Sequence, residues 1–472
     1  MKNKIFFYFL AILIGVLSQT VRVFAQNIET KPRVIVTTDG EIDDECSMVR
    51  FLLYANEFDI EGIITSSSQY HWQGHKWAGD DWLNPYLEAY AKVYPNLILH
   101  DTDYPKPEYL NSVSVLGNVS AEGEMETITA GSELIVKALL KDDPRPIWLQ
   151  AWGGVNTIAR ALKTIEEKHS EKMPEVARKL RLYLIWEQDN TFQSYIRPHW
   201  GKYNIETIIS DQFVTYFYTW KKFLPETAKA YLVGDWMKPH ILENHGPLCS
   251  LYKAHPNGDF RSEGDSPAFL HTIPNGLRSI ESPDFGGWGG RFVKIRENTW
   301  LDPVLEPKYT YPEGRWWTNN AWGRQRMKKE IENDSALQAY LKPTSQWIPA
   351  IQNDFAARAD WCVKPFKETN HPPKVSLKMP LNLTVKRKQK VELDASPTTD
   401  PDGDKLFFNW YAYADASTYK GQLRIGQPDQ KKTKLIVPAD AKKGDTIHMI
   451  CEVKDDRIPQ LTRYQRVVLT IN

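Results

Sequence analysis

The first part of the chain alternates short apolar runs with segments in which apolar residues recur at helical spacing. The runs Arg33–Thr38 and Ile60–Thr65 are rich in β-branched residues and lack polar alternation, so each predicts a strand buried on both faces. Between them, apolar residues at helical spacing predict a helix over Cys46–Asn56. This βαβ unit favours a parallel sheet.

The same pattern recurs further along the chain. It predicts helices over Ser132–Leu140 and Asn156–Lys168, and strands over Pro146–Gln150 and Leu180–Ile185. Such alternation is typical of an α/β domain with a doubly wound, mostly parallel sheet. Ligands of these sheets bind at the carboxyl ends of the strands.

From about Gly201 to Lys364 the pattern becomes irregular and rich in Trp, Gly and Pro. We expect surface loops around a site there rather than disorder, because the aromatic content is too high for disorder. Four tryptophans in this part would serve either as flat platforms for a sugar or, more commonly for such side chains, as buried packing: Trp288, Trp316, Trp317 and Trp322.

A linker at His371-Pro372-Pro373 precedes a change to short strands separated by turn residues. About a hundred residues of this pattern predict an all-β immunoglobulin-like sandwich, with Trp410 as its core aromatic. We therefore expect an α/β domain over residues 30–368 and a β-sandwich over residues 372–472. The predicted strands are Val375–Leu377, Lys390–Leu393, Leu406–Tyr413, Lys434–Val437, Thr446–Val453 and Tyr464–Ile471.

Residues 1–25 predict a signal peptide. Two lysines precede the apolar run Ile5–Leu17, and a Val-Phe-Ala triplet ending at Ala25 resembles a cleavage site. The run is short for a bilayer span, so an uncleaved membrane anchor is the weaker alternative. We expect an exported protein, periplasmic or extracellular.

The charge and the aromatic content of the chain limit the classes of partner that we expect it to bind. Lys+Arg and Asp+Glu both total 59, so no basic field attracts nucleic acid or acidic lipid. The 17 Trp and 22 Tyr residues are many, and aromatic faces stack on sugars as well as filling cores. We expect a sugar-containing small molecule or polysaccharide as partner, no nucleic acid polymer and no membrane after signal removal; a homodimer is left open. The four dispersed cysteines favour buried free thiols over disulfides.

Four acidic side chains crowd the predicted loop that follows the first strand: Asp39, Glu41, Asp43 and Asp44. Carboxylates crowded beside a buried strand are costly when nothing compensates them. Ca²⁺ accepts about six to eight oxygen ligands in irregular geometry and would resolve this repulsion. An acidic cap on the following helix is the alternative, but one or two acids suffice for a cap. The pattern therefore favours a Ca²⁺ site.

The segment Val36–Asp44 resembles the N-terminal signature of nucleoside hydrolases, Asp-x-Asp-x-Gly-x-Asp-Asp. Three further segments follow in that family's order. Gly62–Ser67 is similar to its second strand, Trp152–Ala159 to its Gly-Pro-Leu-Thr-Asn-Ile-Ala segment and Glu263–Pro267 to its late His-Asp-Pro. The chain resembles in particular the exported cellulose-binding, nucleoside-hydrolase-like proteins that carry a C-terminal β-sandwich.

This resemblance implies a Ca²⁺-dependent hydrolase of N-glycosidic (nucleoside-like) or related sugar bonds, with a metal-bound water as nucleophile. Asp39, Asp44 and Asp265 would ligate the ion, together with a backbone carbonyl near Asn156. Asp39 would also be the catalytic general base. Asp43 would accept hydrogen bonds from sugar hydroxyls.

Departures from the family pattern support an alternative function. Gln69 stands about where the family has a ribose-contacting Asn, and Gly264 stands where many members have a His that assists the leaving base. The alternative is a non-catalytic protein that binds cellulose or another plant polysaccharide on the same scaffold; a cell-surface interaction protein with a structural Ca²⁺ is a third hypothesis. The remaining candidate substrate-binding residues are Gln69, His71, Asn156, Glu187 and Glu263.

A second acidic motif, Asp400-Pro401-Asp402-Gly403-Asp404, begins like a Ca²⁺ loop. Tyr411 stands where such a loop would have its Glu. We expect a turn between strands, with a loosely held Ca²⁺ as the alternative.

Overall fold

An eight-stranded sheet organises the first part of the computed structural model, which describes residues 31–210, 220–303 and 341–472. All neighbouring strands pair in parallel except β7 and β8, which are antiparallel. The strands run in the order β3 (Ser114–Leu116), β2 (Asp59–Thr65), β1 (Arg33–Thr38), β4 (Ile147–Ala151), β5 (Leu180–Ile185), β6 (Glu206–Ser210), β8 (Thr299–Leu301) and β7 (Val293–Arg296). The mostly parallel α/β fold is confirmed.

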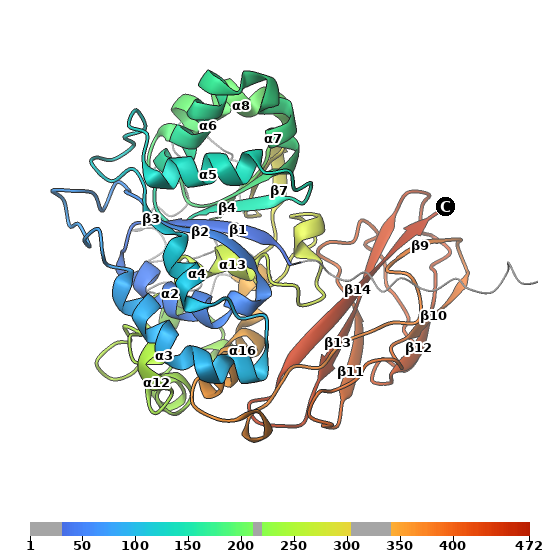
Figure 1. Ribbon diagram of the computed structural model, residues 1–472. Helices are drawn as coiled ribbons and strands as arrows, with labels where there is room; N and C mark the ends of the chain where they lie inside the picture. Colours follow the sequence, from blue (N-terminus) through green and yellow to red (C-terminus); the bar gives the residue numbers. More distant parts are fainter. Residues whose placement is uncertain (1–30, 211–219, 304–340) are drawn as a thin grey trace, which may run out of the picture. The chain divides into compact units, whose positions relative to one another are not determined.

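The chain reverses its direction across the sheet between β1 and β4. From β1 it moves outward through β2 to β3, and it then returns to β4 on the other side of β1. The helices that follow β1 and β4, α2 (Ile42–Leu53) and α6 (Asn156–Lys168), consequently lie on opposite faces of the sheet (Figure 1). In open α/β sheets the crevice formed at such a point is where ligands bind.

Helices cover both faces of this sheet. In Figure 1, α5, α6 and α7 lie on one face, and α2, α3 and α16 lie on the other. The α-helices are α2 (Ile42–Leu53), α3 (Asn84–His100), α4 (Pro107–Ser112), α5 (Ala130–Leu140), α6 (Asn156–Lys168), α7 (Met173–Lys179), α8 (Arg197–Trp200), α9 (Trp220–Phe223), α10 (Glu226–Lys229), α11 (Gly234–Met237), α12 (Gly246–Cys249), α13 (Ser266–Leu270) and α16 (Ile348–Trp361). None of the described helices combines the length and apolarity that a membrane span requires.

The predicted start of the first helix is wrong. Helix α2 begins at Ile42 rather than Cys46, so Asp43 and Asp44 lie in its first turn and not in a loop. The Glu41 backbone N–H donates to the Asp44 carboxylate at 3.1 Å, which satisfies one of the free amides at the helix start. Two acidic side chains that were assigned to the loop therefore lie at the N-terminus of the helix, where negative charge is favourable.

The expectation of loops throughout residues 201–364 is also wrong. This part of the chain supplies β6, β7, β8 and α16. The strands were missed because they are short; β6 has only two large apolar residues in succession. Trp288 is fully buried and so offers no platform. Trp316, Trp317 and Trp322 lie outside the described residues, as does the predicted signal peptide.

Two smaller sheets form the C-terminal β-sandwich. One has the strand order β11 (Phe407–Ala412), β13 (Thr446–Lys454), β14 (Thr462–Ile471), β9 (Asn382–Val385), and the other pairs β10 (Lys390–Asp394) with β12 (Lys432–Ile436). All pairs are antiparallel except β14 with β9. Trp410 lies in their shared core with Leu393 and Leu435, as expected for the core aromatic.

One predicted strand of the sandwich is wrong and one strand was missed. Val375–Leu377 forms no strand, whereas β9 was not anticipated. Polar residues occupy alternate positions of β9, and its partner β14 lies at the far end of the chain. Only the tertiary pairing makes this segment a strand.

The sandwich and the α/β part belong to one compact unit, Pro32–Asn472. Backbone amides of Tyr464 and Arg466 on β14 donate to the carbonyls of Asn275 and Gly276, both at 3.0 Å. Gly276 has a positive φ of 88°, and a Cβ there would stand 1.8 Å from the Tyr464 carbonyl oxygen. This close approach requires glycine. The predicted boundary between residues 368 and 372 stays a prediction.

Candidate metal centre

Carboxylates from three separate segments meet at the carboxyl edge of β1. Asp39 follows the strand, Asp43 and Asp44 lie in the first turn of α2, and Asp265 directly precedes α13. Ligand atoms of Asp43, Asp44 and Asp265 lie within 4.8 Å of one another. Asp39 forms a second group of the same dimension with Glu41 and His71. The fold thus brings the distant Asp265 to the acidic segment, as expected.

Several of these carboxylate oxygens are buried without a partner. Asp39 is 0% exposed, and neither of its carboxylate oxygens accepts a hydrogen bond of good geometry in the described part of the chain, although Ser68 and Asp44 lie close enough to lower its pKa. Oδ2 of Asp265 likewise accepts no such hydrogen bond from the described residues. Asp44, in contrast, accepts from the Thr38 hydroxyl and from the backbone amide of Asp39 at 3.3 Å. Buried charged oxygens that lack donors are strongly unfavourable unless a cation lies against them.

The pKa values of these carboxyl groups show the same electrostatic cost of burial. Burial and the charge of Glu41 raise the pKa of Asp39 to about 8. Burial and the neighbouring carboxylates hold the pKa values of Asp43, Asp44 and Asp265 well above their usual range. A divalent cation would reverse these shifts because it favours the ionised form. An all-carboxylate donor set of this kind fits a hard cation such as Ca²⁺.

The loop after β4 packs directly against Asp39. A Cβ at Gly153 would stand 2.9 Å from Cβ and Cγ of Asp39, so no larger residue fits without a shift. Asp189 holds this loop in place, because its Oδ2 accepts from the backbone amides of Val155 at 2.7 Å and Asn156 at 2.9 Å. Asp189 therefore supports the site, and it was not among the candidate site residues that the sequence indicated.

Gln69 and His71 lie in the segment that follows β2, beside the acidic group. The backbone amide of Gln69 donates to the Gln188 carbonyl at 2.8 Å, which ties this segment to the one after β5. His71 Nδ1 is 3.2 Å from Glu41 Oε1. Burial lowers the pKa of His71, so the imidazole is mainly neutral at pH 7 and can both donate and accept.

The other three candidate substrate-binding residues are fully buried and held by neighbours. Asn156 Nδ2 donates to Ser67 Oγ and to two backbone carbonyls at 2.8–3.0 Å. Glu187 accepts from Gln193 Nε2 at 2.6 Å. Glu263 forms an ion pair with Arg50, with N–O distances of 2.5 and 2.9 Å. These contacts hold the segments around the site in fixed positions.

The second acidic motif has the hydrogen bonds of a turn. Asp400 Oδ1 accepts from the backbone amides of Asp402 at 2.9 Å and Asp404 at 3.1 Å. The Asp402 carboxylate faces Nδ1 of His371 at 3.0 Å. Ligand atoms of the three aspartates lie within 4.8 Å of one another. The turn and the loosely held Ca²⁺ are both compatible with this arrangement.

A carboxylate cluster at the switch point of a doubly wound sheet, followed by a β-sandwich, defines a nucleoside hydrolase-like protein with an added C-terminal module. Residues 33–292 match the family described as "Cellulose-binding Sde182, nucleoside hydrolase-like domain". Residues 390–471 match the C-terminal domain of cellulose-binding protein Sde0182. The chain belongs to this family of Sde182-type, nucleoside hydrolase-like proteins.

One solved structure agrees with this assignment. A nucleoside hydrolase-related protein from Saccharophagus degradans, described as associated with carbohydrate metabolism, is 30% identical with a TM-score of 0.73; the match covers 94% of this chain and 100% of that one. The effector protein XOO4466 is 8% identical with a TM-score of 0.34, covering 66% of this chain and 95% of that one. The PKD domain of the KIAA 1837 protein is 14% identical with a TM-score of 0.16, covering 21% and 89%. No curated protein matches the chain.

Proposed function

We propose that this protein is an exported, Ca²⁺-dependent hydrolase of N-glycosidic or related sugar bonds. The observation that carries the proposal is Asp39, a fully buried carboxylate whose oxygens accept no hydrogen bond of good geometry from the described residues. Asp44 and Asp265 add buried carboxylates at the same edge of the sheet. In the ionised form such an arrangement requires a cation, because without one these carboxyl groups bind protons instead.

Each aspartate would have a separate task. Asp39, Asp44 and Asp265 would hold the ion, and when bound, Ca²⁺ would supply positive charge that orients sugar hydroxyls and favours loss of a proton from water. Asp39 would act as general base toward the attacking water. Asp43 would accept hydrogen bonds from sugar hydroxyls as positive charge develops on the ring.

A second candidate function is carbohydrate binding without catalysis. The family description names cellulose, and cellulose lies outside the cell. Gly264 and Gln69 replace residues that the nucleoside hydrolase pattern would use for the leaving group and for ribose. Loss of both would leave a cation site that still binds hydroxyls. An exported location supports either candidate equally.

Sugar release from a panel of nucleosides and aryl glycosides separates the two candidates. We expect turnover that falls on addition of a chelator and is lost in Asp39→Asn. Asp81→Asn is a matched control, because Asp81 is exposed and lies in the same part of the chain. If calorimetry shows bound Ca²⁺ while no substrate is turned over, the hydrolase proposal is wrong and the binding function takes its place.

A further inference from the structure

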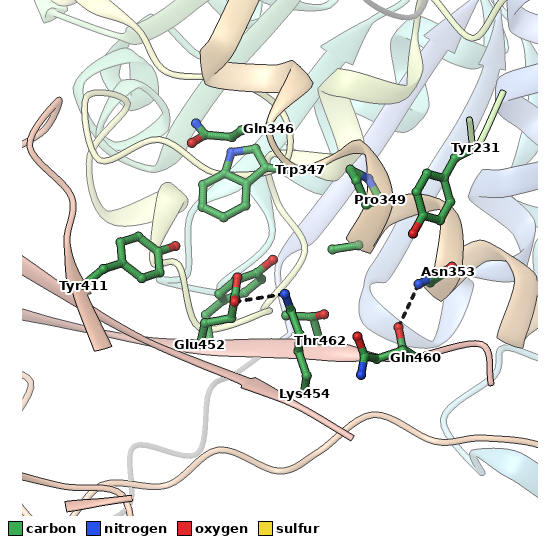
Figure 2. A pocket seen from close by; sticks show the side chains of 12 residues that line it. Tyr231, Gln346, Trp347, Pro349, Asn353, Tyr411, Glu452, Lys454, Gln460 and Thr462 are labelled. Carbon is green, nitrogen blue, oxygen red and sulfur yellow. Dashed lines mark hydrogen bonds and ion pairs between the residues drawn. The ribbon is translucent and has the colours of Figure 1, made fainter. Parts of the chain in front are cut away.

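A polar hollow lies between the start of α16 and the exposed face of the sheet formed by β11, β13 and β14. Its volume is about 290 Å³. Figure 2 shows Trp347 and Tyr231 facing it from the α/β part, and Tyr411, Glu452 and Lys454 facing it from the sandwich. It shares no residue with the metal centre.

The hollow combines aromatic rings with paired polar groups. Glu452 and Lys454 form an ion pair at 3.1 Å, so this acid and base offset each other's charge. Asn353 Nδ2 donates to the Gln460 carbonyl at 3.0 Å. Tyr411 lines the hollow with a partly exposed side chain that carries a hydroxyl group. This mixture suits an uncharged ligand with many hydroxyls and some apolar C–H surface.

A second hollow is also lined by Tyr411. Its volume is about 260 Å³, and Ser417, Tyr419 and Lys420 are among its lining residues. Each volume is at or below the lower end of the range typical of ligand pockets, about 300 Å³. Two small hollows with one lining tyrosine in common suit separate units of a chain better than one large ligand.

The two walls are held in fixed positions before any ligand binds. Arg463 on β14 pairs with Asp354 on α16 at 2.5 Å, and both side chains are largely buried. Trp347 packs edge-on against Tyr464 with ring centroids 5.3 Å apart. A preformed site avoids the entropy that is otherwise lost when loops are ordered on binding.

We infer that these two hollows, which we name the junction cleft, bind a neutral polysaccharide chain, with sugar units on either side of Tyr411. The partly exposed rings of Tyr231 and Tyr411 would stack on sugar C–H groups, and Glu452 with Lys454 would bind adjacent hydroxyls. This inference goes beyond the proposed function, because it concerns a separate surface. It holds whether or not the metal centre hydrolyses its ligand.

Calorimetric titration of the full chain with cellohexaose tests the inference, with pull-down on insoluble cellulose as a second measurement. We expect Tyr411→Ala and Glu452→Ala each to weaken binding by about tenfold, because each removes a hydrogen bond or a stacking face in a sheltered site. Glu392→Ala is the matched control. Glu392 also pairs with a lysine two positions away, at 3.8 Å, but its side chain is 81% exposed on the other sheet.

Asp39→Asn distinguishes this site from the metal centre. We expect this variant to bind cellohexaose as the wild type does. If Asp39→Asn abolishes binding and the junction cleft variants retain it, the glycan lies at the metal centre, and the inference is overturned while the proposed function stands.

The inference is also overturned if the wild type retains neither probe, or if Tyr411→Ala and Glu452→Ala bind like Glu392→Ala. Thermal unfolding checks that each variant is folded. Should Tyr411→Ala fail to fold, Glu452→Ala together with Tyr411→Phe decides the matter, since Tyr411→Phe removes only the hydroxyl.

Discussion

Replacement of Arg50 by methionine should destabilise the protein far more than loss of a surface ion pair. Arg50 lies on α2, and its side chain and that of Glu263 are both 0% exposed. Besides two contacts to Glu263, its guanidinium donates to Gln352 Oε1 at 2.5 Å and to the Ile351 carbonyl at 3.3 Å. It also lies over the Phe355 ring, 3.9 Å from the centroid.

Arg50→Met leaves the Glu263 carboxylate buried opposite an apolar side chain. Removal of one partner from a buried ion pair costs about 3–5 kcal/mol, because the remaining charge loses its compensation. Tyr252 and Ser266 still donate to Glu263, at 2.8 and 2.7 Å, so we expect a value at the lower end, about 3 kcal/mol.

Urea unfolding followed by circular dichroism measures this loss. Arg145→Met is the matched control, since Arg145 also forms two ion pairs, at 2.5 and 2.8 Å, but its side chain is 33% exposed. There we expect a loss of about 1 kcal/mol or less. The double variant Arg50→Met/Glu263→Met should recover part of the stability, because it removes both charges. Equal losses in Arg50→Met and Arg145→Met would refute the reasoning, as would no recovery in the double variant.

Three further predictions concern the metal centre and the attachment of the sandwich. Gly153→Ala should weaken Ca²⁺ binding by about tenfold in calorimetry, because the added Cβ would stand 2.9 Å from Asp39. Gly201→Ala is the control and should leave Ca²⁺ affinity unchanged, because a Cβ there would meet no atom within 4 Å. Equal Ca²⁺ affinities of the two variants would contradict this prediction. Removal of Ca²⁺ by chelator should lower the melting temperature of the wild type and leave Asp39→Asn almost unchanged, and an unaffected wild type would argue against a bound cation. Burial alone would raise the pKa of Asp354, but the charges of Arg463 and Arg358 bring it from 3.8 down to about 2. This depressed pKa contributes about 2 kcal/mol of stability above pH 4, which is lost as the pH falls through 2. In a pH series of urea unfolding, Asp354→Asn should therefore be less stable than the wild type at pH 7 and nearly equal to it at pH 2, and a constant gap would contradict the assigned cause.

Much of the parallel sheet was predictable because its signals are local. β1 and β5 match the predicted strands residue for residue, and α6 matches the predicted helix. A continuous run of β-branched residues, or a 3.6-residue spacing of apolar residues, reflects how one segment is buried. It does not depend on which other segments pack against it. The start of α2 was misplaced because acidic residues indicate both a loop and a helix N-terminus, and the sequence does not distinguish them.

The candidate site divides in the same way. The sequence by itself placed Asp39, Asp43 and Asp44 together, because they are neighbours in the chain after one buried strand. Asp265 was reached only through the resemblance to nucleoside hydrolases, and the fold then brought it next to Asp44. That Glu263 pairs with Arg50, 213 positions earlier in the chain, could not be predicted from either segment alone.

The junction cleft had no sequence signal at all. Its walls come from the α16 region and from strands of the sandwich, and none of these segments has an unusual pattern of its own. The spacing of apolar residues in a strand or helix reflects which of its faces is buried, so the sequence determined most of these elements. It also determined the early acidic cluster, whose members are neighbours in the chain. Which side chains from distant segments face one another depends on how packed elements are placed in space, and only the tertiary structure decided that.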